Sequence, residues 1–274
     1  MVAVNAIPRV LNAMAVPNVS ADEAHALLST ELGRMLALAR TLEEADWSKP
    51  TACTAWNVRD MLAHQAGSYA SGTGYMEMIH QYLSLPKAGQ LPEDAINETQ
   101  LSDRADRSPA ELIAELESAG PVAAHKWAYQ FRLMKLVTIP HRTAGSLNVG
   151  YLMTVVHSRD TWMHRLDICR ATGRPFEQTA EHDGRIAALV MVDVARCLLK
   201  KAGGRSILFD LTGTAGGQWQ IGSGEPSATI RMDVLDFNVF ASGRSTYQQA
   251  RPQAAIDGDI PWAEAALKNL LVLY

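Results

Sequence analysis

The segment from His157 to His164 reads HSRDTWMH, and the predicted fold is organised around it. It lies in a predicted helix over residues 147–171. Residues three or four positions apart share one face of a helix, so His157, Asp160 and His164 point to the same side. The other side carries apolar residues at helical spacing, namely Leu152, Val155, Val156, Trp162, Met163, Leu166 and Cys169. This pattern is typical of a bundle helix that presents polar side chains to an interior or a cleft.

The composition is that of an ordinary globular protein. The 274 residues, 47% of them hydrophobic and 20% charged, suffice for one large domain or two ordinary ones. A formal net charge of -4 gives no basic surface for nucleic acid or an anionic membrane. No apolar run reaches the ~18 residues of a membrane span. Three widely spaced cysteines, Cys53, Cys169 and Cys197, fit a reducing cytoplasm rather than a disulfide framework or a thiolate zinc site.

Two helices are predicted between residues 20 and 83. The first starts at Ser20 and runs to about residue 45. The second starts at Asn57, with Asp60 at its third position, and resumes after several glycines. His64 lies on the anchored second turn of this helix. A rigid element of this kind suits a metal ligand, although a core histidine bonded to a backbone carbonyl fits the same position.

A third helix starts at Ser108, where a capping residue is followed by proline at the first helical position. It is predicted to reach about Gly120, with a break at Pro121, and a continuation towards Val137 is left open. Residues 86–103 and 138–146 are predicted to be connecting loops. Together with the helix over residues 147–171, capped by Ser146, these helices favour an antiparallel four-helix bundle.

The character of the sequence changes near Phe176, and the hydrophobic period switches to two after Gly203 and Gly204. A helix over residues 183–201 precedes strands at 207–212, 218–221, 228–232 and 255–256, with helices that start at Asp233 and Pro261. The predicted fold class is therefore α+β. It consists of an arm over residues 1–19, a four-helix bundle over 20–178, and a small α+β domain with an antiparallel sheet over 179–274.

Several motifs resemble a known family. They are TAWNVRD at residues 54–60 with His64, and Asp160 followed by HRLD at 164–167 and ATGRP at 171–175. With these motifs the sequence resembles the mycothiol-dependent maleylpyruvate isomerase family, whose N-terminal half is a DinB-like metal-binding four-helix bundle. The C-terminal part, with LTG at 211–213, resembles the sterol-carrier-like domain of those proteins.

The resemblance implies a site for a divalent metal, with zinc the leading candidate. Its first ligand falls on His64 and its last on His164. The middle ligand, a glutamate or histidine in the family, falls on Asp160, which is one methylene shorter than glutamate. His157, one turn earlier, is left as a substitute ligand or as a catalytic group that lines the cavity. Spacing favours Asp160, because four residues rise about 6 Å along a helix and seven rise about 10.5 Å.

The resemblance also implies the chemistry. Mycothiol, a low-molecular-weight thiol, would be the cosubstrate, and a small electrophile the second substrate of an isomerase or S-transferase. Two histidines and a carboxylate leave a coordination position at which the thiol is held as thiolate. The family's arginine from the second domain matches Arg244 best, with Arg231 and Arg251 as alternatives. Asp167 is placed to accept the second ring N–H of a ligand histidine or to pair with Arg170.

Two other functions fit the same sequence. A metal-dependent hydrolase would hold water instead of a thiol at the open position. A non-catalytic carrier of apolar ligands would use the sterol-carrier-like part alone. Neither nucleic acid nor a membrane is an expected partner, and a homodimer is left open. None of the three cysteines is expected to be the nucleophile.

Overall fold

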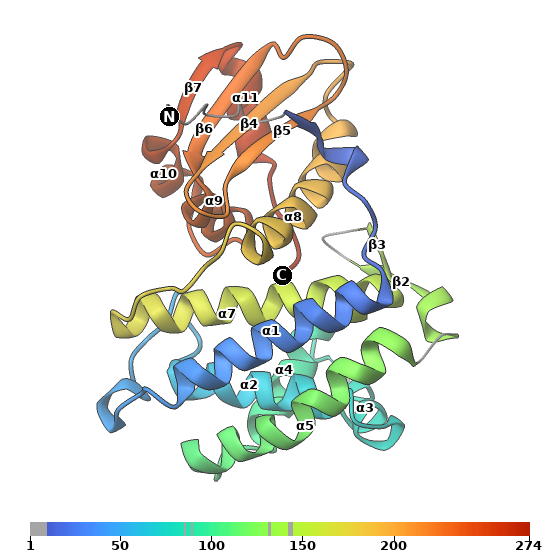
Figure 1. Ribbon diagram of the computed structural model, residues 1–274, viewed down its shortest axis with the longest axis vertical. Coiled ribbons are helices and arrows are strands. Elements are labelled where there is room, and N and C mark those ends of the chain that lie inside the picture. Colours follow the sequence, from blue (N-terminus) through green and yellow to red (C-terminus); the bar gives the residue numbers. More distant parts are fainter. Residues whose placement is uncertain (1–9, 85, 89, 131–132, 142–144) are drawn as a thin grey trace, which may run out of the picture. The chain divides into compact units, whose positions relative to one another are not determined.

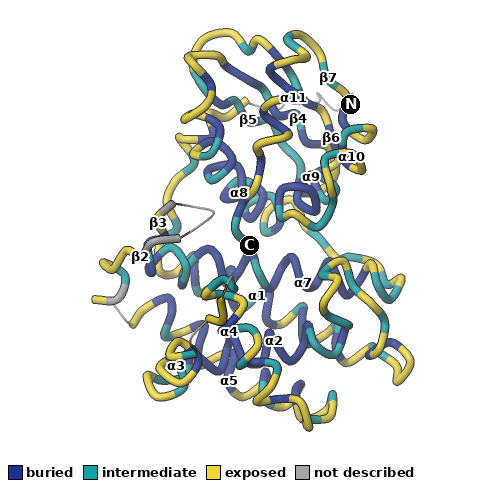
Figure 2. The backbone as a smooth tube through the Cα atoms, turned by 180° about the vertical axis from the view of Figure 1, so that it is seen from behind, coloured by how far each residue is buried: buried dark blue, intermediate teal, exposed yellow. Residues whose placement is uncertain are grey.

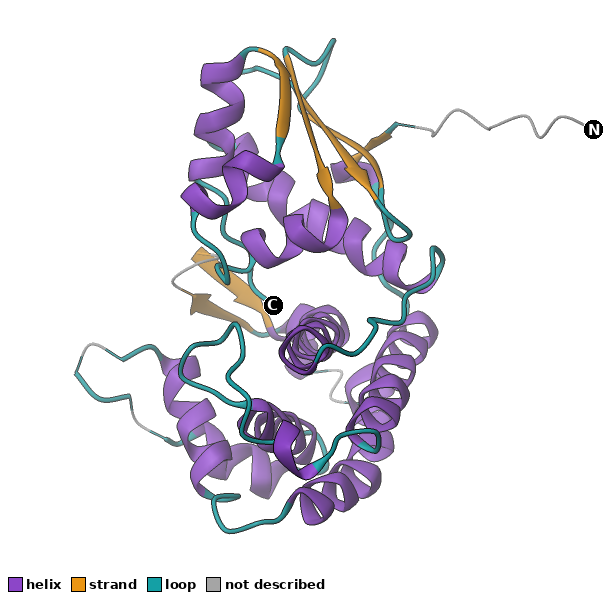
Figure 3. Ribbon diagram, turned by 90° about the vertical axis from the view of Figure 1, so that its left-hand side faces the viewer, coloured by secondary structure: helices purple, strands orange, loops and turns teal. Residues whose placement is uncertain are grey.

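The computed structural model describes residues 10–84, 86–88, 90–130, 133–141 and 145–274. The chain forms two compact units (Figure 1). The first, here called the bundle unit, comprises residues 19–140 and 146–176. The second, the sheet unit, comprises residues 1–18, 141–145 and 177–274. The predicted α+β class is confirmed, and Figure 3 shows the helices and strands of both units.

Helices dominate the bundle unit. Its principal helices are α1 (Ala21–Ala39), α2 (Val58–Ser71), α3 (Tyr75–Tyr82), α4 (Pro92–Ser102), α5 (Pro109–Tyr129) and α7 (His157–Thr172). Short turns are η2 (Glu44–Asp46), η3 (Met134–Leu136) and α6 (Val149–Tyr151), and the π-helical turn η4 (Leu152–Val156) leads into α7. α2 is buried along nearly its whole length (Figure 2). It therefore lies at the centre of this unit.

The helix starts follow the sequence signals. The side chain of Ser20 accepts a hydrogen bond from the backbone N–H of Glu23 at the start of α1. Asn57 and Asp60 form a reciprocal capping box at the start of α2, and Ser108 caps α5 in the same way. Each cap satisfies backbone N–H groups that have no partner within the helix. The three predicted starts are confirmed.

Several predictions for the bundle were wrong. The stretch over residues 86–103 contains α4, and the stretch over 138–146 contributes to a two-stranded sheet of β2 (Thr138–His141) and β3 (Gly145–Asn148), instead of loops. α1 ends at Ala39 instead of near residue 45, and Asn148 rather than Ser146 caps the segment that leads to α7. α4 escaped prediction because its sequence is polar, with Ala95 and Gln100 its buried residues.

α5 also runs through Pro121 without a break, contrary to prediction. A proline inside a helix removes one backbone hydrogen bond and costs about 3 kcal/mol. Buried residues on both sides of Pro121, among them Leu116, Ala123 and Trp127, keep the two halves packed in the core. This burial offsets the cost of the proline.

The sheet unit holds a five-stranded sheet in the order β1-β5-β4-β6-β7. Its strands are β1 (Leu11–Asn12), β4 (Ile207–Thr212), β5 (Gly217–Ile221), β6 (Ala228–Asp233) and β7 (Ala255–Gly258). The sheet is mixed instead of antiparallel, because β4 pairs in parallel with β6 and β1 in parallel with β5. Ile207, the first residue of β4, is paired with the last residue of β5 on one side and with the first residue of β6 on the other. β6 therefore starts at the same end of the sheet as β4 and runs in the same direction.

Helices cover one face of this sheet (Figure 3). They are α8 (His182–Leu199), α9 (Val234–Ala241) and α11 (Ile260–Lys268), with the short turns α10 (Tyr247–Ala250), η1 (Ala13–Ala15) and η5 (Arg251–Gln253). Alternate residues of β4, namely Ile207, Phe209 and Leu211, are buried beneath them. Across the described ranges no helix is long and apolar enough to span a membrane.

Candidate metal centre

Three side chains predicted as metal ligands converge inside the bundle unit. His64 lies on α2, and Asp160 and His164 lie one turn apart on α7. Nε2 of His64 is 3.4 Å from Oδ2 of Asp160, and Nε2 of His164 is 3.2 Å from Oδ1 of the same carboxylate. One ligand atom from each residue lies within 4.8 Å of the others.

Local structure fixes the two helices that carry these residues. The capping box at Asn57 sets the direction of the first turns of α2, so His64 projects from an anchored element. Trp56, just before this cap, places its indole ring 4.9 Å from the ring of His64 and 5.8 Å from that of His164. The indole shields the two histidines, which are only 7% and 4% exposed.

The second nitrogen of each histidine has its own acceptor. Nδ1 of His64 lies 2.8 Å from Oε1 of Gln100 on α4. Nδ1 of His164 lies 3.3 Å from Oδ2 of Asp167. Nε2 of His164 faces Asp160 in the same way, and a carboxylate oxygen can only accept, so the ring donates to Asp167, to Asp160, or to both when it is protonated. Of the two partners predicted for Asp167, the histidine is therefore present.

Asp160 is the electrostatic centre of the group. Burial opposes its ionisation, but the charges of the neighbouring His164 and His64 outweigh burial and hold the pKa of this carboxyl well below its usual range. The carboxylate also accepts a hydrogen bond of 2.6 Å from Nε2 of Gln65. The hydroxyl of Thr161 donates in turn to Oε1 of Gln65 over 2.8 Å. Asp160 is thus ionised and held in one orientation.

His157 lies beside this group but does not join it. In the part of the chain that the structure describes, His157 belongs to neither cluster whose ligand atoms lie within 4.8 Å of one another. Its ring stacks on Trp127 at 4.0 Å and 5°, and its Nδ1 is 3.3 Å from the hydroxyl of Ser68. Burial is the main reason that the pKa of His157 falls to about 4, with a smaller opposing effect of Asp160. His157 is therefore a neutral imidazole at neutral pH.

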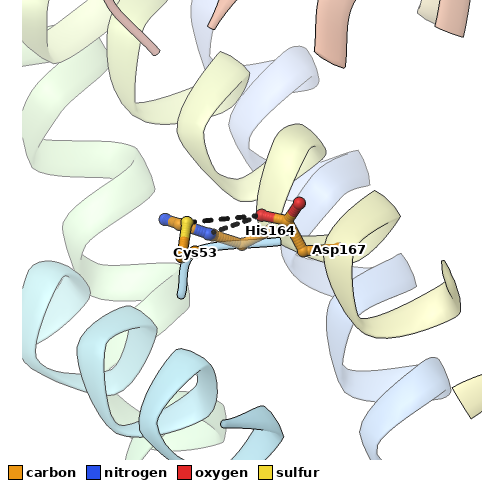
Figure 4. Close-up of side chains that lie close together, drawn as sticks. All are labelled: Cys53, His164 and Asp167. Atoms are coloured by element: carbon orange, nitrogen blue, oxygen red, sulfur yellow. Dashed lines mark hydrogen bonds and ion pairs between the residues drawn. The ribbon is translucent and has the colours of Figure 1, made fainter. Parts of the chain in front are cut away.

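A second cluster shares His164 (Figure 4). It consists of Cys53, His164 and Asp167, and the thiol of Cys53 lies 4.0 Å from Oδ2 of Asp167. The same Asp167 oxygen therefore faces both the Cys53 thiol and Nδ1 of His164. Burial raises the pKa of a second cysteine, Cys169, to about 11, which disfavours the reactive thiolate.

The three candidate arginines belong to the sheet unit. Arg244 follows α9, and its backbone N–H donates to the carbonyl of Val239. The side chain of Arg231 donates to Asp210 over 2.7 Å, and that of Arg251 to Glu264 over 3.2 Å. Arg231 and Arg251, the two alternatives, are thus each engaged in an ion pair. The assignment of Arg244 to bind substrate stays a prediction.

Comparison with known proteins identifies the family. The family model described as Mycothiol maleylpyruvate isomerase N-terminal domain matches residues 28–169, more than half of the 274 residues. The chain belongs to this family. The resemblance drawn from the motifs is confirmed, and His64, Asp160 and His164 all lie within the matched residues.

Solved structures extend the likeness to both units of this family member. Crystal structures of the mycothiol-dependent maleylpyruvate isomerase and of its histidine-to-alanine mutant each align with a TM-score of 0.57 and 12% sequence identity. Each alignment covers 91% of this chain and 97% of the other chain. At this identity the likeness shows a common fold. A search of the curated proteins found no match.

The residues that hydrogen-bond to the candidate metal ligands were not predicted from the sequence. Gln65 adjoins His64, and Gln100 lies on the helix that was predicted as a loop. Glutamine is common on helix surfaces, so neither residue carries a signal by type. Pro92 followed by Glu93 and Asp94 is a signal for a helix start that would have revealed α4.

Proposed function

We propose that this protein is a metal-dependent enzyme that uses a low-molecular-weight thiol of the mycothiol type. The thiol would act on a small electrophilic substrate, in an isomerisation or an S-transfer. Membership of the mycothiol maleylpyruvate isomerase family supports the thiol and the isomerase class. The chemistry of the candidate metal centre supports the metal.

The observation that carries the proposal is the convergence of acceptor atoms at Asp160. Nε2 of His164 lies 3.2 Å from the carboxylate, and Nε2 of His64, whose Nδ1 faces the amide oxygen of Gln100, lies 3.4 Å from it. Two acceptors at this distance repel each other unless a cation lies between them or a histidine is protonated. Zinc ligands bonded tetrahedrally at about 2.0–2.1 Å lie roughly 3.3–3.4 Å apart. The donor set therefore suits a divalent zinc-like ion held by His64, Asp160 and His164.

A metal bound there would lower the pKa of the cosubstrate thiol and supply the thiolate. The protein's own residues prepare this step. Trp56 shields one side of the centre, which strengthens electrostatic interactions inside it. His157 lies beside the centre as a neutral imidazole, and we assign it to line the thiol site; a pKa of about 4 makes it a weak acceptor for the thiol proton. The thiolate would add to one carbon of an activated double bond, whose electron pair would move to the conjugated carbonyl oxygen. Rotation and loss of the thiolate would restore the double bond in an isomer, whereas protonation and release of the adduct would complete an S-transfer.

Metal analysis followed by thiol-dependent turnover tests the proposal. Purified protein is analysed for metals and then assayed against a panel of electrophiles, maleylpyruvate included, with mycothiol, with glutathione and with no thiol. We expect turnover that needs both a thiol and a divalent ion, that stops with a chelator, and that returns with zinc. Turnover without any thiol would contradict the thiol-dependent class and favour hydrolysis. A protein that neither carries nor binds a divalent ion would contradict the proposed metal dependence. Protonation of a histidine would then explain the short distances between the histidines and Asp160.

A further inference from the structure

Two buried glutamines connect His64 to the backbone of its own helix. Nδ1 of His64 lies 2.8 Å from Oε1 of Gln100, and Nε2 of Gln100 donates to Oε1 of Gln81 over 2.8 Å. Nε2 of Gln81 then donates to the carbonyl of Gly67 over 2.9 Å and to Oε1 of Glu77 over 2.8 Å. Gln81 is 0% exposed and Gln100 is 4% exposed. We call Gln81 and Gln100 the glutamine relay.

The direction of every hydrogen bond in the relay follows from the two acceptors at the Gln81 end. The carbonyl of Gly67 and the carboxylate of Glu77 only accept, so the amide nitrogen of Gln81 must face them. The amide oxygen of Gln81 consequently faces Gln100 and requires a donor from it. The nitrogen of Gln100 is committed to that bond, and its oxygen is left for His64.

An acceptor at 2.8 Å fixes where the His64 ring carries its proton. Nδ1 must donate to Gln100, so the neutral ring keeps its lone pair on Nε2. Nε2 is the atom that faces Asp160 at 3.4 Å. Both ring nitrogens face an acceptor, but the contact with Gln100 is 2.8 Å and that with Asp160 is 3.4 Å, so the proton belongs at the shorter contact. An unmade hydrogen bond at that buried contact costs about 1–3 kcal/mol.

The relay depends on a close approach of two helices. A Cβ atom added at Gly67 on α2 would lie 2.7 Å from Cβ and Cγ of Gln100 on α4. Real side-chain contacts are about 1 Å longer, so only glycine at this position lets Gln100 reach beneath His64. Arg104, two residues beyond α4, donates to the carbonyl of Gln100 over 3.2 Å and binds Glu115 on α5 at 2.7 Å and 2.9 Å.

We propose that Gln81 and Gln100 are positioning residues that hold His64 in the tautomer protonated at Nδ1 and thereby set the metal affinity of the centre. The tautomer follows from the direction of the relay and from the longer distance to Asp160, whereas the effect on affinity rests on the proposed function. Partners of this kind, one step removed from a ligand, change metal affinity by about 10–100-fold when they are replaced. The residue furthest from the metal, Gln81, gives the sharpest test because it touches no ligand.

Nitrogen NMR of the His64 ring in the metal-free protein is the direct readout. At alkaline pH, two-bond couplings distinguish a ring protonated at Nδ1 from one protonated at Nε2. We expect the Nδ1 form in the wild type, a mixture in Gln81→Met, and restoration of the Nδ1 form in the double variant Gln81→Met/Gln100→Glu, whose carboxylate only accepts. Gln220→Met, which removes a half-buried glutamine from the sheet unit, should leave the His64 signals unchanged.

Zinc affinity, measured by competition with a chelator on the same proteins, is the second readout. Gln81→Met should weaken zinc binding about 10-fold or more, and Gln220→Met should not change it. A His64 ring protonated at Nε2 in the wild type, or a Gln81→Met protein that keeps both the wild-type tautomer and the wild-type affinity, would overturn the proposal. If the wild type shows the expected tautomer and binds no zinc, the proposed function fails and the effect on affinity falls with it.

Discussion

The replacement Gly67→Ala tests how tightly the packing of α2 on α4 controls the candidate metal centre. The new methyl group would lie 2.7 Å from two carbon atoms of Gln100 and 3.1 Å from Nη1 of Arg104. Carbon atoms pack at about 3.5–4.0 Å, so α4 would have to move by roughly 1 Å. A movement of that size along the 2.8 Å bond between Gln100 and His64 would lengthen it beyond the limit of a hydrogen bond.

Two opposing terms set the expected change in stability. Overpacking of a buried position costs about 1–3 kcal/mol. Alanine in place of glycine inside a helix contributes about 0.5–1 kcal/mol in the other direction. We therefore expect Gly67→Ala to lower the free energy of unfolding by about 1 kcal/mol. Zinc affinity should fall by about 10–100-fold, as for other partners of metal ligands.

A matched control is present on α1. A Cβ added at Gly33 meets no atom within 4 Å, so Gly33→Ala should stabilise the protein by about 0.5–1 kcal/mol. It should also leave zinc binding unchanged. Urea unfolding and chelator competition on both variants give the comparison. If Gly67→Ala is as stable as Gly33→Ala and binds zinc like the wild type, the helices are not in the tight contact described here.

Four further outcomes follow from the centre. His64→Ala and His164→Ala should each lose most of about one divalent ion per chain in elemental analysis, and full occupancy in both would show that the cluster is accidental. Asp160→Ala should cut zinc affinity sharply while His157→Ala keeps the metal and loses turnover; the reverse pattern would make His157 the ligand. The pKa of His157 is lowered from 6.5 to about 4, so the unfolded chain binds the extra proton between these values and stability should fall as pH drops from about 6.5 to about 4. His157→Phe should remove that part of the pH dependence in urea unfolding, and an unchanged pH profile would refute the assignment. Cys53→Ser should keep metal and turnover in the same assays, because no cysteine is assigned as nucleophile, and a loss of turnover alone would reopen that question.

Local signals were sufficient for part of the fold. The caps at Ser20, Asn57 and Ser108 fixed the starts of three helices, because a cap depends on residues within one turn. α4 was not predicted because it has no apolar stripe. Its buried residues include Gln100, which hydrogen-bonds to His64 and does not pack in a hydrophobic core. Strand periodicity reports which residues are buried but not the direction of a neighbour, so the parallel pairing of β4 with β6 was missed.

The candidate metal centre was likewise predicted only in part from the sequence. The i,i+4 spacing of Asp160 and His164 follows from helix geometry alone, and the family motifs supplied His64 from a distant helix. Gln65 and Gln100 act through hydrogen bonds across helices, which no spacing along the chain expresses. The residues that orient the ligands therefore required the packed structure.

The parallel pairing of β1 with β5 has a consequence for how the chain folds. Leu11 is aligned with Trp219, so an edge of the sheet must wait for residues more than two hundred positions downstream. In a chain whose bundle unit has not yet folded, closing a loop of this length costs roughly 5 kcal/mol of chain entropy by the logarithmic rule for flexible loops. Two residues of strand cannot supply this, so β1 should add last, after the other four strands have formed. During synthesis the β5 edge is briefly uncovered, and a fragment that starts after the bundle would keep it uncovered and tend to associate through that edge.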